Sequence, residues 1–461
     1  MMFKSKITAL FFCITLTAAS QNWQSVGGGA NNAVLCVYGD PANNELYAAG
    51  YFDSIGGIPA NYIAKWNGST WNSLGSGFKT GNFGWHGLTM YRGKIVAAGQ
   101  TFSFANFHIA TWDGTQWDSI GYDFLDPGFQ GVAAINNELY AFGTFGVINS
   151  INYNGIAKYD TISGSWVSLG FPYVMTFGDP ATIRCVSFYH GKLYVGGLFL
   201  DGTSTTTANI ACYDGSTWDI VGAGITGFAD DVFDLEVYQD DLYAAGAFSL
   251  SSGNPGNKIA QWNDTVWRDV GGGVTSTGQI HDLLLYNGKL LAGGSFSNIG
   301  GIPANYIASW DGTNWCGYGT DMYSAPPTSL ATTSGELYLA TNSIWDSIDV
   351  NSIAEWAGGS FVDSCGHISV GINETEISQR LLHIYPNPSS NNITIEFDLL
   401  KQEMICFEIR NVLGQIVYTK TEQFLGGKQS IEIDINDFPN GVYFVHLQNG
   451  NRIGSAKLIK N

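Results

Sequence analysis

Residues 286–315 read YNGKLLAGGSFSNIGGIPANYIASWDGTNW, and close variants of this segment recur along the chain. Its apolar runs are separated at Asn287-Gly288 and at Asp311-Gly312. Such dipeptides between apolar runs indicate tight hairpins of the type I′ class, because these turns need residues that tolerate a positive φ. Together with the apolar run that ends at Tyr286, the segment predicts four short antiparallel strands, which we call A to D from the inside outwards.

An aromatic residue marks the fourth strand of every copy. The positions, which follow one another at intervals of 46–52 residues, are Trp23, Trp71, Trp117, Trp166, Trp218, Trp267, Trp315 and Phe361. A four-stranded unit with this period is typical of a β-propeller blade. The chain holds seven A–B–C sets and eight D-type segments, so we predict an all-β, seven-bladed propeller over residues 21–368. Either Asn22–Val26 or Phe361–Ser364 would complete the last blade, because an open ring leaves sheet edges unpaired.

The lengths of the connections separate two faces of this ring. The A–B and C–D turns are nearly constant, whereas the D–A and B–C connections differ from copy to copy. Variable loops on a rigid frame are where binding residues usually lie. The repeated tryptophans, in contrast, are interpreted as packing between blades, where large aromatic side chains bury the most area. We therefore expect any binding site on the face of the D–A and B–C connections, which we call the variable face.

The candidate binding residues stand at the start of strand A. They form one ring of equivalent positions: His86, Gln130, Arg184, Phe233, His281 and Thr328. Trp85 precedes one of them and Asp282 follows another, and both join the candidate site. The simpler interpretation is that these side chains cap the central channel and bind water. Two histidines without a closely spaced third ligand do not predict a metal site, and neither a metal nor another cofactor is expected.

Composition restricts the partners. The formal net charge is −19, and the balance of 20 Lys+Arg against 39 Asp+Glu argues against nucleic acids and anionic membrane surfaces, which attract basic patches. Solubility outside the cell is the simplest reason for this charge, with weak cation binding as an alternative.

Enzyme classes find little support in the sequence. The segments Asp113–Trp117 and Asp214–Trp218 resemble the Asp-boxes of sialidases, but Asp and Gly are adjacent, which is the wrong spacing. The arginines do not cluster as a carboxylate site would need. A glycosidase pair drawn from Asp230, Asp231 and Asp282 stays open, since such enzymes need two carboxylates at a set separation. Catalysis is left undecided, with the balance against it.

The N-terminus resembles a secretory signal. Lys4 and Lys6 precede an apolar run from Ile7 to Ala18, and small residues stand before Gln21, which predicts cleavage after residue 20. No later segment is long enough for a transmembrane helix. An exported protein can pair its cysteines, yet the spacings suggest no framework. Isolated buried thiols are therefore expected, with Cys316–Cys365 as the least implausible disulfide.

The character of the chain changes near residue 371. Residues 369–382 are predicted as a linker, and residues 383–461 hold short alternating strands that predict a small immunoglobulin-like β-sandwich. Its motifs are Pro386-Asn387-Pro388, a segment around Gly414, Gly441 with Tyr443, and a terminal Lys-Leu-Ile-Lys from Lys457 to Lys460. In this order they resemble the type A C-terminal sorting domain of the type IX (Por) secretion system of Bacteroidota. That resemblance implies export through the outer membrane, removal of the domain, and release or attachment at the cell surface.

The propeller repeat itself resembles kelch-like and cortical-marker-like repeats, with their Gly-Gly and Trp positions; those families mostly mediate interactions. Three hypotheses follow. The first is an exported propeller that binds an extracellular glycan or protein. The second is a propeller enzyme that acts on extracellular polysaccharide, and the third is a structural surface protein without a specific ligand. The identity of the ligand and the oligomeric state are not predicted.

Overall fold

The computed structural model of the chain divides into two compact units, Met1–Val370 and Gly371–Asn461. All regular secondary structure in its described residues is β-strand, which confirms the all-β prediction. The predicted signal peptide and most of the predicted linker lie outside the described residues. The described residues are 23–75, 83–101, 109–121, 128–148, 150–175, 179–202, 207–225, 230–249, 256–275, 277–317, 326–341, 351–356, 360–362, 368–370, 383–399, 403–411, 416–425, 427–449 and 452–461.

In the first unit, the described strands form seven four-stranded antiparallel sheets, which we number as blades 1 to 7. The first four blades, inner strand first, are β2 (Val34–Asp40), β3 (Glu45–Gly50), β6 (Ile63–Trp66) and β7 (Trp71–Ser73); β8 (Phe83–Tyr91), β9 (Lys94–Thr101), β10 (Ile109–Trp112) and β11 (Trp117–Ser119); β12 (Phe129–Ile135), β13 (Glu138–Gly143), β16 (Ile156–Asp160) and β17 (Ser165–Ser168); and β18 (Thr182–Tyr189), β19 (Lys192–Leu198), β20 (Ile210–Tyr213) and β21 (Trp218–Ile220).

The remaining three blades are β22 (Val232–Tyr238), β23 (Asp241–Gly246), β24 (Ile259–Trp262) and β25 (Trp267–Asp269); β26 (Ile280–Tyr286), β27 (Lys289–Gly294), β30 (Ile307–Trp310) and β31 (Trp315–Gly317); and β32 (Pro327–Thr332), β33 (Leu337–Thr341), β34 (Ile353–Trp356) and β1 (Trp23–Ser25). Three B–C connections carry two-residue strand pairs on the variable face. These are β4 (Ser54–Ile55) with β5 (Ile58–Pro59), β14 (Val147–Ile148) with β15 (Ile151–Asn152), and β28 (Asn298–Ile299) with β29 (Ile302–Pro303).

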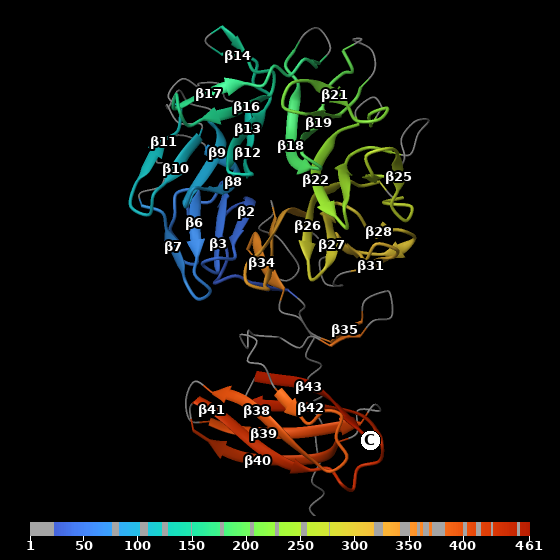
Figure 1. Cartoon of the computed structure of the whole chain (residues 1–461). Helices are drawn as coiled ribbons and strands as arrows, with labels where there is room; N and C mark the ends of the chain where they lie inside the picture. The colour runs from blue at the N-terminus through green and yellow to red at the C-terminus, as the bar shows by residue number, and fades with distance from the viewer. Residues whose placement is uncertain are drawn as a thin grey trace, which may run out of the picture. The chain divides into compact units, whose positions relative to one another are not determined.

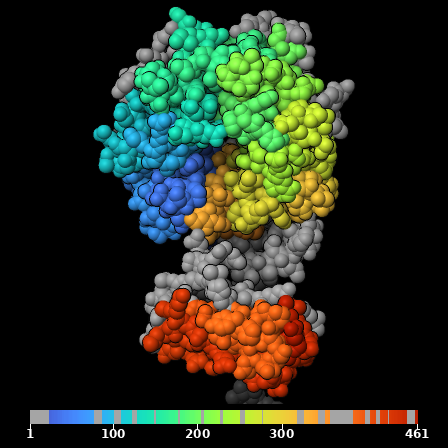
Figure 2. Space-filling model, viewed as in Figure 1, coloured from blue at the N-terminus to red at the C-terminus, as the bar shows by residue number. Residues whose placement is uncertain are grey.

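The blades close into a ring. Each inner strand contacts the inner strand of the next blade, and β32 of the last blade contacts β2 of the first. Figure 1 shows the inner strands gathered around the centre, and in Figure 2 the first, blue blade adjoins the last, orange one. The N-terminal β1 completes blade 7 by pairing with β34, Trp23 opposite Trp356. The alternative segment at Phe361 lies instead in β35 (Ser360–Val362), which pairs with β36 (Ile368–Val370).

Two kinds of turn connect the strands, and one differs from the prediction. The A–B turn at Asn287-Gly288 has positive φ at both residues, as type I′ geometry requires. At the C–D turn, only Gly312 has a positive φ, while the Asp311 carboxylate accepts the backbone N–H groups of Thr313 and Asn314. The C–D turn is therefore an Asx-capped loop rather than a type I′ turn, because the aspartate side chain replaces part of the backbone hydrogen bonding.

The repeated tryptophans join neighbouring blades, as predicted. In blades 1 to 6, the indole N–H of the D-strand tryptophan donates to the backbone carbonyl three residues after the corresponding tryptophan of the preceding blade, at 2.8–3.0 Å. The next residue along is a glycine in several blades, and a Cβ on Gly27 or Gly271 would overlap the tryptophan rings of the following blade. The pairs, donor first, are Trp71–Val26, Trp117–Leu74, Trp166–Ile120, Trp218–Leu169, Trp267–Val221 and Trp315–Val270.

The second unit contains two antiparallel sheets that share one apolar core. One sheet has three strands, β37 (His383–Tyr385), β38 (Asn392–Leu399) and β41 (Gly427–Asp434), and the other has four, β40 (Ile416–Phe424), β39 (Glu403–Asn411), β42 (Gly441–Asn449) and β43 (Arg452–Lys460). Alternate residues such as Ile393, Ile395 and Phe407 are fully buried between the sheets. The predicted β-sandwich is thus present.

The cysteines depart from the prediction at one position. Cys36, Cys185 and Cys212 are buried thiols outside any disulfide and Cys406 is a partly buried one, as expected. Cys316, however, is disulfide-bonded. The partner considered from the sequence, Cys365, lies outside the described residues. Buried isolated thiols were the wrong expectation for Cys316, because sequence spacing says nothing about which loop returns to the outer strand of blade 6.

Candidate functional site

A β-bulge interrupts the inner strand of every blade at the candidate ring. In each pairing with strand B, one residue near the start of strand A has no partner. A bulge turns its extra residue out of the ladder and re-aims its side chain. The bulged residues are Leu35, His86, Gln130, Arg184, Phe233, His281 and Thr328. The structure therefore gives the predicted ring a common backbone conformation, and it adds Leu35 from blade 1, which the sequence comparison missed.

The glycine that ends strand B makes room for this bulge. Gly246 is paired with Val232, and a Cβ on Gly246 would overlap the carbonyl oxygen of Asp231. Gly143 stands in the same relation to the carbonyl oxygen of Gly128. The repeated glycine of the LYAAG-type segments is thus required by the close approach of the bulged strand, since any side chain there would meet the backbone.

Arg184 lies at the centre of the best-connected arc of the ring. Its Nε donates to Asp231 Oδ2 at 2.6 Å, and its Nη1 donates to Gln130 Oε1 at 2.9 Å. The guanidinium carbon also lies 5.3 Å from the centre of the Phe233 ring, within the range of a cation–π contact. Burial raises the pKa of Asp231, although the charge of Arg184 opposes that shift. Three blades are thereby linked at the channel mouth.

His281 continues the arc beyond Phe233, with the two rings 6.2 Å apart. Its Nδ1 lies 2.9 Å from the carbonyl oxygen of Pro327, which can only accept, so Nδ1 carries the proton. Burial lowers the pKa of His281. The neutral ring therefore has Nε2 as a hydrogen-bond acceptor.

The other predicted residues, His86, Thr328 and Trp85, do not belong to the arc around Arg184. Burial also lowers the pKa of His86, whose Nε2 is buried and has no hydrogen-bond partner among the described residues; its ring lies 6.2 Å from that of Tyr51. Thr328 donates to the backbone of blades 1 and 7. Trp85 lies in β8 opposite Gly99, and its side chain is outside the described part of the structure.

Asp282 does not belong to the ring. It follows the bulge, and its Oδ2 accepts the N–H of Leu330 on β32 of the next blade. Asp234 has the same relation to blade 6, since its Oδ2 accepts the N–H of Leu283 at 2.7 Å. At the next junction, Ser329 Oγ accepts the N–H of Val37 at 3.3 Å. The position after the bulge is thus a repeated link between blades rather than a site open to the variable face.

The two aspartates form an acidic cluster that the sequence analysis missed. Asp234 and Asp282 each follow the bulged residue of adjacent blades, and Glu236 lies two residues after Asp234 on β22. Burial, followed by the Asp234 charge, raises the pKa of Asp282 well above its ordinary value, and burial also raises the pKa of Asp234. Burial and Asp234 raise the pKa of Glu236 from 4.5 to about 7. The signal was present in the repeat, because Asp234 and Asp282 occupy equivalent positions in adjacent blades.

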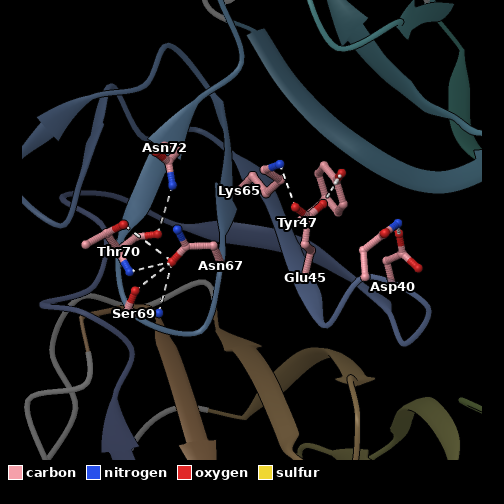
Figure 3. Close-up of polar contacts among 9 residues, drawn as sticks. Asp40, Glu45, Tyr47, Lys65, Asn67, Ser69, Thr70 and Asn72 are labelled. Carbon is pink, nitrogen blue, oxygen red and sulfur yellow. Dashed lines mark hydrogen bonds and ion pairs between the residues drawn. The ribbon is translucent and has the colours of Figure 1, made fainter.

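The opposite face carries repeated polar contacts near the turns. In blade 1, Lys65 Nζ lies 2.7 Å from Glu45 Oε1, and the Tyr47 hydroxyl donates to the other oxygen of Glu45 (Figure 3). Blade 3 repeats this pair as Lys158 and Glu138 at 3.0 Å. Figure 3 also shows Asn67 capping the C–D turn of blade 1, next to Ser69 and Thr70. The repetition indicates that these contacts support the blades.

One contact on that face is not repeated. His190 in the A–B turn of blade 4 hydrogen-bonds through Nδ1 to Asp264 and through Nε2 to Asp240 at 3.0 Å, both in turns of blade 5. Hydrogen bonds to Asp264 and Asp240 raise the pKa of His190. Among the described residues, no group of three His, Cys, Asp or Glu side chains has a geometry that could hold a metal ion.

The sorting motifs meet at one end of the second unit. Asn387 Oδ1 accepts the N–H of Ile459 at 2.9 Å, and Ser389 exchanges backbone hydrogen bonds with Ile459 and Asn461. Gly441 on β42 pairs with Lys460 on β43. The buried side chain of Tyr443 donates from its hydroxyl to the carbonyl of Pro439 at 2.7 Å. Pro386 and Pro388 flank Asn387, so motifs from both ends of this unit are adjacent. Gly414 and the side chain of Lys457 lie outside the described residues.

Two family models match separate parts of the chain, one in each compact unit. Residues 383–461 match the secretion system C-terminal sorting domain, and residues 287–308 match a β-propeller described as a domain of unknown function (DUF5122). No curated protein matches the chain. The described residues contain no helix that could cross a bilayer. The sorting domain indicates export by the type IX system to the cell surface or the medium, and contact with that secretion machinery.

Solved structures show only distant similarity. A Bacteroides ovatus protein titled "Xyloglucan PUL GH43B" is 9% identical, with 94% of this chain and 92% of that chain covered and a TM-score of 0.29. A glycoside hydrolase family 43 arabinoxylan arabinofuranohydrolase from Bacillus subtilis is 10% identical, with 94% and 95% covered and a TM-score of 0.24. Dimeric latent PorU from Porphyromonas gingivalis is 11% identical, with 63% and 33% covered and a TM-score of 0.15. At these scores the similarities carry no conclusion about activity.

Proposed function

We propose that this exported protein binds a neutral extracellular glycan at the variable-face end of its propeller channel, without cleaving it. The observation that carries the proposal is the arc of bulged residues around Arg184. It brings together guanidinium donors, the amide of Gln130, the ring of Phe233 and the Nε2 acceptor of His281. An apolar ring beside a few convergent donors and acceptors is the usual composition of a small-molecule site.

The charge of the arc favours a neutral ligand. The Arg184 guanidinium already pairs with Asp231 at 2.6 Å, so the arc has no uncompensated positive charge to attract an anion. The chain carries a formal net charge of −19, which repels anionic ligands at long range. Hydroxyl groups of a sugar can both donate to His281 Nε2 and accept from Arg184 and Gln130.

The carboxylates near the mouth favour binding over hydrolysis. Retaining and inverting glycosidases need two carboxyl groups about 5–5.5 Å and about 6.5–9.5 Å apart, respectively, that are open to the substrate. Asp234 and Asp282 both accept backbone N–H groups of the next blade, and Asp231 is paired with Arg184. Two of the carboxyl groups considered from the sequence, those of Asp231 and Asp282, are thus engaged in the structure of the ring.

The test is a glycan-array screen of the mature protein, followed by calorimetry on each ligand found. Phe233→Ala and Gln130→Ala should weaken binding about tenfold or more, equivalent to about 1.4 kcal/mol or more. Phe188→Ala is the matched control, because Phe188 is an exposed aromatic residue of an inner strand outside the ring. Unchanged binding in both ring variants would reject the site. Release of any sugar product would establish the enzyme alternative, and binding to no glycan would leave the structural or protein-binding alternatives.

A further inference from the structure

The strand β40 is an exposed edge of the sorting domain. It stands at one end of the four-stranded sheet β40-β39-β42-β43, and among the described strands only β39 pairs with it (Figure 1). Seven of its nine residues are exposed, and the other two are partly buried. The edge strand of a sheet presents backbone N–H and C=O groups on which a further strand can pair. The open side of β40 is therefore a surface for another strand.

Exposed apolar side chains distinguish this edge from the other edges of the domain. Ile416, Val417 and Leu425, which directly follows the strand, are 50%, 39% and 65% exposed. β41, an edge of the other sheet, carries no exposed large apolar side chain in its described residues. The edge strand β43 is covered in part, because Lys460 forms a bridge with Ser389 and β43 contacts β37. Of these edges, β40 gains most from a partner strand.

The charges on β40 do not protect it against pairing. A lysine on an edge strand normally opposes the approach of a second strand. Lys420 is the only lysine or arginine of β40, and its Nζ lies 2.7 Å from Glu422 Oε2, so its charge is balanced within the strand. The second unit is also nearly neutral, since residues 371–461 hold 8 Lys+Arg and 10 Asp+Glu, a formal charge of −2 out of the chain's −19. Two copies of this unit therefore repel each other only weakly.

The sequence of β40 is complementary to itself in one antiparallel register. Opposite residues of a symmetric antiparallel pair lie on the same face of the sheet, so one residue must face its own copy. With Thr421 at this centre, Lys420 of each copy stands opposite Glu422 of the other, and Tyr418 stands opposite Phe424. With Lys420 or Glu422 at the centre, like charges face each other instead. Opposite charges and aromatic pairs across strands stabilise a sheet, whereas like charges destabilise it.

We propose that two copies of the protein pair through their β40 strands, antiparallel and centred on Thr421, so that the two four-stranded sheets become one. Val417 of each copy then packs against Leu425 of the other, which covers exposed apolar side chains of the edge. Tyr418 and Phe424, which pack against the core of the domain, extend that core across the junction. The pairing does not depend on a ligand of the propeller. It belongs to the form of the protein that still carries the sorting domain.

Sedimentation of the mature protein over a range of concentrations tests the pairing, in about 0.15 M salt to screen the acidic propellers from each other. The mass should double as the concentration rises. Lys420→Glu places like charges opposite each other at two positions and should raise the dissociation constant of the dimer about tenfold or more. Lys428→Glu, at an exposed position of β41, changes the net charge equally and should dimerise as the wild type. A wild type that stays monomeric, or equal dimerisation of Lys420→Glu and the wild type, would overturn the proposal.

Mixing two variants supplies the decisive experiment. Glu422→Lys alone should dimerise as weakly as Lys420→Glu, because four positive charges then meet at the junction. In an equimolar mixture of the two variants, opposite charges face each other again, so heterodimers should form with about the affinity of the wild type. Both side chains are exposed, and recovery in the mixture would also show that both variants fold. A mixture that stays monomeric would contradict the proposal.

Discussion

The indole Nε1 of Trp71 donates a hydrogen bond to the carbonyl oxygen of Val26, 2.8 Å away and 45 residues earlier in the sequence. Trp71 belongs to the outer strand of blade 1, and Val26 follows β1 of blade 7. This bond therefore contributes to the closure of the ring, where the two ends of the propeller meet. The same relation joins the later blades, so the spacing of the tryptophans is the spacing of the blades.

Replacing Trp71 with Phe should remove this hydrogen bond while keeping an aromatic ring. We expect the free energy of unfolding to fall by about 1–3 kcal/mol, because a buried carbonyl loses its donor. Trp23→Phe is the matched control, since Trp23 holds the same strand position but its buried Nε1 has no partner in the described structure. Denaturant titration of both variants would measure the difference. Equal losses would show that ring volume, and not the hydrogen bond, stabilises the junction.

A glycine substitution tests the packing beneath the bulges. A Cβ on Gly246 would overlap the carbonyl oxygen of Asp231, which precedes the bulge that carries Phe233. Gly246→Ala should therefore destabilise the propeller by about 1–3 kcal/mol through overpacking. It should also weaken any ligand found for the channel mouth. Thermal unfolding measures the first effect, and a stability within error of the wild type would mean that the bulge can shift without cost.

The sequence predicted the repeated parts of the fold well and the junctions poorly. Hairpin dipeptides and the aromatic period define each blade, because these signals are local or repeat at a fixed distance. The bulges could not be predicted, since a bulge exists only relative to a partner strand. The segment that completes blade 7 also stayed open, because Trp23 and Phe361 carry equivalent aromatic signals and only the pairing of β1 with β34 distinguishes them.

The candidate site was likewise only partly predictable from the sequence. Repeat alignment found Gln130, Arg184 and His281, because they are irregular residues at a regular position. It assigned Asp282 to the variable face, whereas its carboxyl group faces β32 and Asp234. The equivalent positions of Asp234 and Asp282 could have been read from the repeat, but the contact with β32 depends on how closely two blades approach, which the repeat does not contain.

Glu236 makes the stability of the propeller depend on pH. Burial and the charge of Asp234 raise its pKa from 4.5 to about 7. A carboxyl group with a raised pKa in the folded state binds more protons when folded, so stability falls as the pH rises from about 4.5 to about 7. The shift corresponds to at most about 3 kcal/mol for this group. Glu236→Gln should flatten this part of the stability profile in denaturant titrations at pH 4.5 and pH 8, and an unchanged slope would reject the assignment.

The pH dependence contributed by His190 has the same sign as that of Glu236, but His190 lies on the other face. Its two ring nitrogens face the carboxylates of Asp264 and Asp240, so the doubly protonated ring makes both contacts. The pKa of His190 is raised, and the contribution of this contact is present at low pH and lost as the pH rises through that raised pKa. Asp264→Asn should lower the pKa measured by NMR titration of the His190 ring. Asp219→Asn, in blade 4, is the control. An unaltered titration of His190 in Asp264→Asn would show that the contact between these two residues does not form in solution.

The last prediction concerns the sorting domain, where Asn387 Oδ1 accepts the N–H of Ile459 at 2.9 Å. This bond fixes the C-terminal strand β43 to the Pro-Asn-Pro segment at the other end of the domain. Asn387→Ala removes the acceptor, so we expect the last strand to loosen and export to fall, with the protein accumulating inside the outer membrane. Fractionation of cells and medium measures the distribution. Deletion of residues 383–461 should block export completely, whereas Asn436→Ala, an exposed asparagine of the same domain, should export normally. Full export of Asn387→Ala would show that the secretion machinery does not need the bond between Asn387 and Ile459.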